Sequence, residues 1–496
     1  MKNIISIANT CIELGHWPSH FKISSTIIIP KYNKTLYDSP KTFKPIVLLN
    51  MLGKLIKKAI SDRLQLHVVS NNFIHHSQLG GLKFKSMTDV DVTLTHFIHT
   101  GWVKNLLTST LAFYISQFFP SLNHHLLSLI LRKAGLDSSI IQFFSSYLVN
   151  RKTKYIWNNS FSHFVDVNIS MGQGSALSPI LSALYLTPFL HILEKWLKSL
   201  NFQTSLLSFV DNGLLITQSK SFKTSNTYFF CSYNVALNFL TKFGLQVKHS
   251  KTKVFHLSRV HGTFNPPSLD LLSLGSPILS PKSSWHYLGF IFNRKLSFHN
   301  HINFYANKAI STIKCIKILS NSTRGLNPYQ KCLLYRCCAI AIALYGFQLW
   351  HYNKAPLSYL IKIMNKMQRR VALWIVDGFK TAPSMDIKAI TSLTPINLHL
   401  QKIEDRSQLR AHLLTSSYIL HYLMSSCNES SLHQHSLSLN FLTRRQYSLI
   451  KGYLVDMDNH FNEIFHSFDP INPELFSGHR IIDTFSNCFL FQPFNK

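Results

Sequence analysis

Two apolar runs separated by a tight-turn signal constrain the fold of this chain more than any other feature. Leu206–Val210 and Leu214–Thr217 are both strand-like, and Asp211-Asn212-Gly213 stands between them. Asn-Gly is among the strongest signals for the two-residue turn of a β-hairpin. The pattern therefore predicts an antiparallel hairpin with Asp211 at its tip.

The segments before this hairpin alternate between strand-like and helical patterns. Strands are predicted over residues 26–29, 45–49 and 108–115, and helices over residues 51–69, 120–131 and 138–148. Gly172-Gln173-Gly174-Ser175 forms a loop that opens a long apolar helix over residues 177–197. Such a loop presents backbone N–H groups at a helix N-terminus, where phosphate binds readily. The pattern is mixed α and β.

The balance of charges indicates a polyanionic partner. The chain of 496 residues has 51 Lys and Arg against 21 Asp and Glu, a formal net charge of +30. A field of this size attracts nucleic acid, whereas an enzyme of acidic metabolites does not need it. The best apolar stretch, Cys337–Trp350, is too short to span a membrane, and the N-terminus lacks a signal-peptide cleavage region. We expect an intracellular protein, nuclear or cytoplasmic, with no membrane partner.

Cysteine and histidine spacings give no metal site. The eight cysteines contain no CxxC pair, so we expect them to be reduced and mostly buried. Histidines cluster at 75–76, 124–125 and 299–301, but no acid or cysteine stands beside them in the sequence. We interpret them as surface histidines.

A series of motifs in a fixed order resembles the reverse transcriptases of non-LTR retrotransposons. The motif sequences resemble those of fungal elements most closely. The motifs are WPSHFK (17–22), FKPIVLLNMLGKL (43–55), QLGGLKF (78–84), FFPSLNH (118–124), GQGSALSPILSALYL (172–186), SFVDNG (208–213), GLQVKHSKT (244–252), WHYLGFIF (285–292) and LYGFQLW (344–350). A single run such as QGSALSP would be weak support, but the ordered series covers nearly the whole chain.

The resemblance implies an α+β right-hand polymerase of fingers, palm and thumb with a helical C-terminal extension. Fingers and palm would occupy residues 1–300, the helical thumb and connection 301–404, and a C-terminal tail 405–496. The implied partners are an RNA template and a DNA primer, with deoxynucleoside triphosphates as the small-molecule substrate. Active relatives often carry an endonuclease upstream, and some carry a ribonuclease H downstream. We expect this copy to be truncated at both ends and to lack both.

The resemblance also implies a catalytic site that this sequence carries only in part. The family holds two Mg²⁺ ions with one Asp on the first palm strand and the first Asp of the hairpin. Asp211 is the hairpin Asp, but Tyr114 stands at the strand position and Asn212 at the usual second hairpin Asp. A phenol with a pKa of roughly 10 stays protonated at neutral pH and does not replace a bridging carboxylate. Lys251 matches the lysine proposed to protonate pyrophosphate, while Lys253 replaces a usual Glu. We therefore predict weak or lost Mg²⁺ binding and impaired catalysis.

Other implied roles fall on residues that are present. Phe119 occupies the place of the aromatic gate that rejects a ribose 2′-OH, and Gln173 and Gly174 match the loop that contacts the nucleotide. Lys31 and Lys44 resemble finger residues that grip the triphosphate, although position 44 is usually Arg, so bidentate contact is lost.

Nucleic-acid contacts are implied further along the chain. Tyr287-Leu288-Gly289 resembles the primer-supporting hairpin, and the basic helix after it resembles a thumb that follows the template duplex. A solvated helix face is the alternative interpretation of these charges. The basic residues in question are Lys362, Lys366, Arg369 and Arg370.

The sequence leaves three hypotheses open. The chain is an RNA-directed DNA polymerase by descent whose catalysis is impaired, or a non-catalytic nucleic-acid-binding protein, or a relic reading frame that is seldom translated. Primer extension separates the first from the second, because only a polymerase extends a primer. A soluble, folded product separates both from the third.

Overall fold

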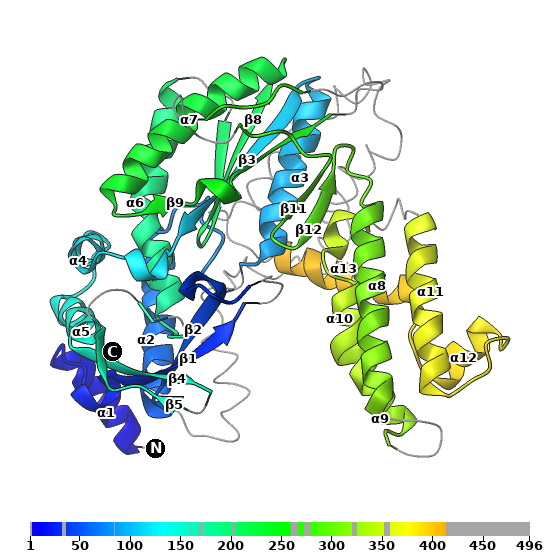
Figure 1. Cartoon of the computed structure of the whole chain (residues 1–496), viewed down its shortest axis with the longest axis horizontal. Helices are drawn as coiled ribbons and strands as arrows, with labels where there is room; N and C mark the ends of the chain where they lie inside the picture. Colours follow the sequence, from blue (N-terminus) through cyan, green and yellow to red (C-terminus); the bar gives the residue numbers. More distant parts are fainter. Residues whose placement is uncertain are drawn as a thin grey trace.

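The computed structural model describes residues 2–412 apart from residues 32–35, 84, 159, 168–170, 173, 201–203, 259–265, 272–277, 320–324 and 352–357. Two β-sheets with their helices lie on one side of the molecule, and a group of helices lies on the other (Figure 1). The long helix α3 (Met87–Val103) stands between the two groups.

The apolar runs predicted at residues 26–29 and 45–49 form the first sheet. β1 (Ile23–Pro30) pairs antiparallel with β2 (Phe43–Leu49) and parallel with β4 (Arg151–Trp157). β5 (Ser160–Phe161) and β6 (Val165–Val167) both pair with β4. The hydroxyls of Thr26 and Thr153 share a buried 2.8 Å hydrogen bond that joins β1 to β4. The helical segments of this part are α1 (Lys2–Glu13), η1 (Ser19–Lys22), η2 (Pro40–Thr42), α2 (Met51–Ser70) and α5 (Ser138–Leu148).

The predicted hairpin and the strand predicted at residues 108–115 pair in a second sheet. The strand order is β10-β3-β8-β7, and β9 pairs with the end of β3. All of these pairs are antiparallel, as a hairpin prediction requires. The strands are β3 (Leu107–Ser116), β7 (Thr204–Phe209), β8 (Asn212–Ser219), β9 (Gln246–Val247) and β10 (Lys253–Leu257).

The second sheet is covered on both faces, because its side chains alternate between two cores. Leu214 and Ile216 of β8 belong to a core that they share with α3. Leu215 lies between them in the sequence and belongs to the other core, together with Leu111 and Phe113 of β3. Successive residues of a strand point to opposite faces, so each core takes every second residue. Burial on both faces explains why these strands are almost continuously apolar.

Side-chain caps set where several helices of the sheet region begin. The helix predicted from residue 120 starts at His124, because the Asn123 side chain accepts a hydrogen bond from the Leu126 N–H. Asn50 caps α2 through the Leu52 N–H in the same way. The remaining helical segments here are η3 (Phe119–Ser121), α4 (His124–Lys133), α6 (Ser178–Ser199), α7 (Phe222–Lys242) and η4 (His249–Lys251).

The chain after residue 280 forms a hairpin followed by helices that share the α3 core. The hairpin consists of β11 (Ser284–Tyr287) and β12 (Phe290–Asn293). The expected boundary at 404/405 falls inside α13, so the chain has no structural break there. The helical segments are α8 (His299–Ile316), η5 (Lys317–Leu319), α9 (Pro328–Leu334), the π-helix η6 (Tyr335–Ala339), α10 (Ile340–Ala343), η7 (Phe347–Leu349), α11 (Ser358–Ile375), α12 (Ser384–Ile390) and α13 (Ile396–His412).

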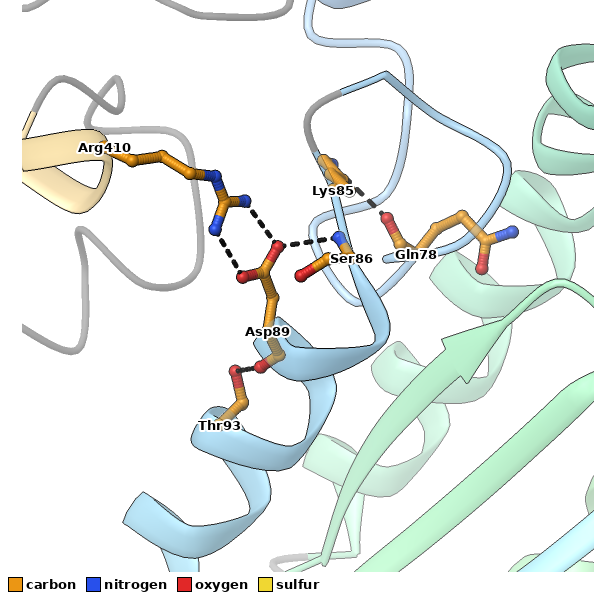
Figure 2. A network of polar contacts seen from close by, with 6 residues as sticks. All are labelled: Gln78, Lys85, Ser86, Asp89, Thr93 and Arg410. Atoms are coloured by element: carbon orange, nitrogen blue, oxygen red, sulfur yellow. Dashed lines mark hydrogen bonds and ion pairs between the residues drawn. The ribbon is translucent and has the colours of Figure 1, made fainter. Parts of the chain in front are cut away.

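A bidentate ion pair joins the last described helix to α3 (Figure 2). Arg410 donates from Nη1 and Nη2 to the two carboxylate oxygens of Asp89, at 2.8 and 2.7 Å. The Asp89 side chain is 3% exposed and also accepts from the Ser86 N–H, which completes the capping box of α3. The contact therefore connects residues 321 positions apart.

Arg410→Ala should destabilise the folded chain by about 2 kcal/mol, because it leaves a buried carboxylate without its charged donor. Arg410 is about a third exposed, and this partial exposure keeps the loss below that of a fully buried pair. Urea unfolding measures the change. Arg406→Ala, an exposed residue on the same helix, is the matched control and should change the free energy of unfolding by under about 0.5 kcal/mol. Equal effects of the two substitutions would show that the ion pair contributes nothing.

A lysine is buried in the core of the first sheet region. Lys57 of α2 is 1% exposed, and its ammonium lies 5.5 Å from the Trp17 ring centroid and 5.4 Å from that of Tyr147. Burial lowers the pKa of Lys57 to about 8, with smaller effects from the charges of Arg151 and Lys54. Within the described residues no carboxylate pairs with it, and its ammonium instead faces the two aromatic rings.

Two further sequence expectations concern membrane-spanning helices and the cysteines. None of the helices in the described ranges is long and apolar enough to cross a membrane. Six of the eight cysteines are described, and they are free thiols, as expected. The expectation that they are mostly buried is wrong, because Cys11 alone of these six is buried while Cys315 and Cys337 are exposed on their helices.

Candidate active site

The tip of the β7–β8 hairpin lies against the end of β3 and brings three predicted site residues together. Tyr114 of β3 is directly opposite Asn212 of β8. Asp211 precedes Asn212, and its carbonyl accepts a 2.8 Å hydrogen bond from the Ile115 N–H. The carbonyl of Tyr114 accepts from the Lys248 N–H at 2.8 Å. Backbone hydrogen bonds therefore fix Asp211 and Tyr114 side by side.

The turn itself is shifted from the prediction by two residues. Phe209 pairs with Asn212, so the turn residues are Val210 and Asp211, and Asn212-Gly213 belongs to β8. Val210 takes the left-handed conformation with φ 56°, which a β-branched residue rarely adopts. The prediction of Asp211 at the tip is confirmed, whereas the interpretation of Asn-Gly as the turn is wrong.

Gly213 is required by packing across the strands. It lies opposite Phe113, and a Cβ at this position would come within 2.2 Å of the Phe113 ring. The ring fills the space that a side chain would need, so this glycine fixes the close contact of β3 and β8. Gly213, which was predicted to form the turn, is therefore needed for strand packing within the sheet.

The Asp211 carboxylate is satisfied by groups of the chain itself. Asn212 donates from Nδ2 to Asp211 Oδ1 at 2.8 Å, and the Tyr114 hydroxyl also donates to this carboxylate. Burial, and then the neighbouring charge and hydrogen bond of Asp211, raise the pKa of Tyr114 to about 12, so the phenol is protonated at neutral pH. Burial raises the pKa of Asp211 above its ordinary value, while the Tyr114 hydrogen bond and the Lys251 charge act in the opposite direction.

Lys251 supplies a positive charge at the same place. Its ammonium lies 3.5 Å from the centroid of the Tyr114 ring, a cation–π contact. Lys253, expected where the family has a Glu, is exposed on β10 and paired with Ala112. A cation and two hydrogen-bond donors therefore surround the one carboxylate.

No second carboxylate of the described chain joins this group. Asp166 lies on β6 of the first sheet. Asp89 and Asp91 lie on α3, next to the C-terminal helices. Asp91 is fully buried, neither of its carboxylate oxygens has a partner among the described residues, and burial raises its pKa well above the ordinary value. Nothing in the local sequence pattern indicates this buried acid.

The predicted nucleotide-contacting residues lie on separate elements, two of them on the β1–β2 ladder of the first sheet. Lys44 is exposed on β2 opposite Ile29, and exposed Lys31 continues the same ladder through its N–H to the Thr42 carbonyl. Phe119 is half-buried, and its carbonyl accepts from the Met171 N–H. Gly174 has φ 123°, and a Cβ there would meet the Val47 carbonyl oxygen at 2.8 Å. Gln173 lies outside the described residues.

The Tyr287-Leu288-Gly289 segment is a hairpin turn, as its expected role requires, but its tyrosine points inward. Tyr287 pairs with Phe290, and its side chain is 6% exposed and stacked on Trp285 at 4.6 Å between ring centroids. The primer-supporting role of this segment stays a prediction, and the Tyr287 side chain is not exposed to take part in it. Leu288, with φ 46°, and Gly289, with φ 91°, form the turn and are half-buried.

Three of the four predicted basic residues of α11 form an exposed stripe. Lys362, Lys366 and Arg370 follow each other at intervals of four, so they share one face of the helix. Arg369 is different, because its guanidinium donates to the carbonyls of Ala382 and Lys380 and to the Ser384 hydroxyl. Arg369 therefore binds the loop before α12, and its predicted contact with nucleic acid stays a prediction.

The histidine interpretation is wrong at two places. His301 is buried, and its ring contacts the Tyr345 carbonyl at 2.9 Å. His75 is also buried, and its Nε2 lies 2.9 Å from Glu194 of α6, an acid distant in sequence. Burial is the main cause that lowers the pKa of His75 to about 4. One sequence signal could have indicated this site. His191 and Glu194 stand three residues apart within the predicted apolar helix, so a polar face that includes Glu194 was predictable there.

Comparisons with known proteins agree with the motif order. The family model described as reverse transcriptase (RNA-dependent DNA polymerase) matches residues 29–292. The retrovirus-related Pol polyprotein from the type-1 retrotransposable element R1 of Bradysia coprophila is 22% identical over 388 residues, covering 78% of this chain and 37% of the relative. The probable RNA-directed DNA polymerase from transposon BS of Drosophila melanogaster is 23% identical over 424 residues, covering 82% and 44%. The chain thus spans less than half the length of these relatives.

A solved structure is also similar. The telomerase of Candida albicans in complex with a TWJ fragment of telomeric RNA superposes with a TM-score of 0.43 at 12% identity, covering 96% of this chain and 68% of that chain. Closeness to fungal elements stays a prediction. The family match covers more than half of the sequence, and it includes β3 and the hairpin that carries Asp211. The chain therefore belongs to the reverse transcriptase family, with the α+β right-hand polymerase fold and with relatives among the RNA-directed DNA polymerases of non-LTR retrotransposons.

Proposed function

We propose that this chain binds RNA template and DNA primer as a reverse transcriptase does, and that its nucleotidyl transfer is impaired. The observation that carries the proposal is the closed group around Asp211. Tyr114 and Asn212 both donate hydrogen bonds to its carboxylate, and the Lys251 ammonium lies over the Tyr114 ring. This arrangement satisfies the carboxylate without a metal ion.

The two-metal chemistry implied by the family does not fit these residues. Mg²⁺ requires oxygen ligands that present lone pairs, and carboxylates of two residues normally supply them. Here the Asn212 amide directs its N–H toward Asp211, and the Tyr114 phenol directs its O–H there. A metal ion at Asp211 would meet the positive ends of both dipoles and the Lys251 charge. Asp211 alone remains as a candidate Mg²⁺ ligand.

The proposed binding surface follows the expected division of the chain. We assign residues 1–300 to fingers and palm and residues from 301 onward to the thumb and connection, which include the whole of α13. A nucleotide would meet Lys31, Lys44, Phe119 and Gly174, and duplex would meet the exposed stripe of α11. We place the protein inside the cell, in the nucleus or cytoplasm, where RNA and DNA are available.

Primer extension on poly(rA)/oligo(dT) with Mg²⁺, and separately with Mn²⁺, tests the proposal beside filter binding of the same duplex. We expect binding without extension. Extension that disappears in Asp211→Ala would contradict the impairment. Extension that survives in Asp211→Ala would reveal a contaminating polymerase, and the preparation would then be repurified. Failure to obtain folded, soluble protein would favour the relic interpretation.

A second candidate function is nucleic-acid binding without catalysis. The exposed basic stripe of α11 favours it. Lys362→Gln/Lys366→Gln/Arg370→Gln should lower the slope of log affinity against log salt by about 2 to 3, because each phosphate contact releases nearly one counterion. The matched control neutralises three exposed residues of α4 and α6, which lie on the opposite side of the molecule (Figure 1): Arg132, Lys133 and Lys195. Equal slopes for the two triple variants would mean that the stripe faces solvent.

A further inference from the structure

Three histidines and one glutamate form a cluster next to the segment that pairs with β7 of the β7–β8 hairpin. The family resemblance assigns no role to these four residues. His75 and His76 follow α2, while His191 and Glu194 are one turn apart on α6. His76 Nε2 lies 3.6 Å from Glu194 Oε1, and His75 Nε2 lies 2.9 Å from Glu194 Oε2. The His191 ring packs against the His75 ring at 4.5 Å between centroids. The ligand atoms of His75, His76 and Glu194 all lie within 4.8 Å of one another, a spacing at which imidazole and carboxylate groups can hold one metal ion.

Hydrogen bonding divides the two adjacent histidines into different roles. The Ser77 N–H donates to His75 Nδ1 at 3.1 Å, so the neutral His75 ring carries its proton on Nε2. This proton points at Glu194 Oε2. His75 is fully buried and therefore holds the carboxylate in place, while its own nitrogens are both engaged. His76 is 47% exposed, and among the described residues its Nε2 makes no polar contact shorter than the 3.6 Å approach to Glu194.

We propose that His76 Nε2 and Glu194 Oε1 bind a divalent transition-metal ion such as Zn²⁺, with His75 as the positioning residue for Glu194. Zn–N and Zn–O bonds are roughly 2.0–2.2 Å long, so two ligand atoms of a tetrahedral site lie about 3.4 Å apart. The observed 3.6 Å between His76 Nε2 and Glu194 Oε1 matches that separation. His191 lies three residues before Glu194 on the same face of α6, and its ring packs against the His75 ring that positions Glu194. A histidine that donates to a ligating carboxylate is a common support of metal sites.

Lys198 is the group that competes for this site. Its ammonium pairs with Glu194 Oε1 at 2.9 Å, the oxygen assigned to the metal, and its side chain is 74% exposed. An exposed ion pair of this kind contributes little and is readily displaced. Removal of Lys198 should therefore strengthen metal binding.

The position of the cluster gives the metal a structural consequence. The residues that follow His76 pair with β7, because Ser208 donates to the Ser77 carbonyl and accepts from the Leu79 N–H, each at 2.9 Å. Gly80 then packs against Val210, where a Cβ would come within 2.5 Å of the Val210 nitrogen. A metal ion that joins His76 to α6 would therefore restrict the motion of residues 77–80, which pack against the hairpin that carries Asp211. We call this effect the brace.

Titration of the metal-free full chain with Co²⁺ and Zn²⁺ tests the proposal without any activity assay. Co²⁺ should give the visible absorption of a tetrahedral site, and Zn²⁺ should remove it by competition. His76→Ala should weaken Zn²⁺ binding at least tenfold, His75→Gln should weaken it about 10- to 100-fold, and Lys198→Met should strengthen it. His125→Ala, an exposed histidine of α4, is the matched control and should bind like the natural chain.

Two outcomes would overturn the assignment. One is the absence of a tetrahedral Co²⁺ spectrum in the natural chain, and the other is equal Zn²⁺ affinity in His76→Ala and His125→Ala. His76 is nearly half exposed, so its removal should leave the fold intact, which circular dichroism checks. The brace is tested separately by hydrogen exchange at Leu79 and Ser208. Exchange at both amides should slow on addition of Zn²⁺, and unchanged exchange in the metal-bound chain would reject the brace.

Discussion

The Tyr114→Asp/Asn212→Asp double variant is expected to gain a Mg²⁺-dependent stability that the natural chain lacks. Tyr114 lies opposite residue 212, next to Asp211, so the two substitutions place three carboxylates around one point. Without metal these charges repel one another and destabilise the fold. A bound ion relieves the repulsion, and at 100 times its Kd it adds about 2.7 kcal/mol to the free energy of unfolding.

Thermal unfolding with and without Mg²⁺, together with isothermal titration, measures this gain. Tyr114→Asn/Asn212→Asp is the matched control, because it has the same side-chain volumes but lacks the new carboxylate at position 114. Asn212→Asp alone should also show no gain, since groups that act as a unit are not restored one at a time. Primer extension by the double variant should be weak, because Lys44 and Lys253 remain. Equal Mg²⁺ affinity of the natural chain and the double variant would disprove the assignment of Tyr114 to a lost ligand position.

Lys57→Met should stabilise the protein by about 3 kcal/mol at pH 7. The Lys57 ammonium is buried between two aromatic rings without a carboxylate partner among the described residues, and its pKa falls from 10.5 to about 8. A tenfold change in a proton-binding constant corresponds to about 1.4 kcal/mol between the two protonation states. Methionine keeps the packing volume and removes the buried charge.

The sign of the pH dependence gives the decisive measurement. Because the folded chain holds this proton less tightly than the unfolded chain, Lys57 destabilises the fold fully below about pH 8 and ceases to do so as the pH approaches 10.5. The difference between Lys57→Met and the natural chain should therefore shrink between pH 8 and pH 10. Lys58→Met, on the exposed face of α2, is the control and should show little change at any pH. A constant difference across this range would refute the explanation.

The sequence predicted best what depends on neighbours along the chain. The helix at residues 138–148 is found with the same bounds as α5, and the strand at 108–115 is β3 with one added residue at each end. Periodicity and apolar runs carry this local information. Asp211 at the hairpin tip was also predictable, although a local turn rule misplaced the turn because the Phe113 ring, distant in sequence, requires Gly213 within β8.

The contacts that the sequence did not predict join residues that are separated along the chain. Tyr287 is buried because its hairpin packs into the α3 core, and no local pattern around residue 287 contains that fact. His75 contacts Glu194, which is 119 positions away in the sequence. Arg369 donates to a carbonyl of a loop whose conformation hydrophobic periodicity does not predict. Motif order could name a position such as Tyr114, but the hydrogen bonds from Tyr114 and Asn212 to Asp211 depend on how β3 meets the hairpin in the folded chain.

The Asp89–Arg410 contact has a consequence for the order in which the chain is made. Synthesis runs from the N-terminus at about 5–20 residues per second, so Arg410 leaves the ribosome's catalytic centre roughly 15 to 65 s after Asp89. During that interval the Ser86 N–H can already cap the Asp89 carboxylate, but its charged partner does not yet exist. The arrival of α13 therefore sets the earliest time at which this ion pair between α13 and α3 can form.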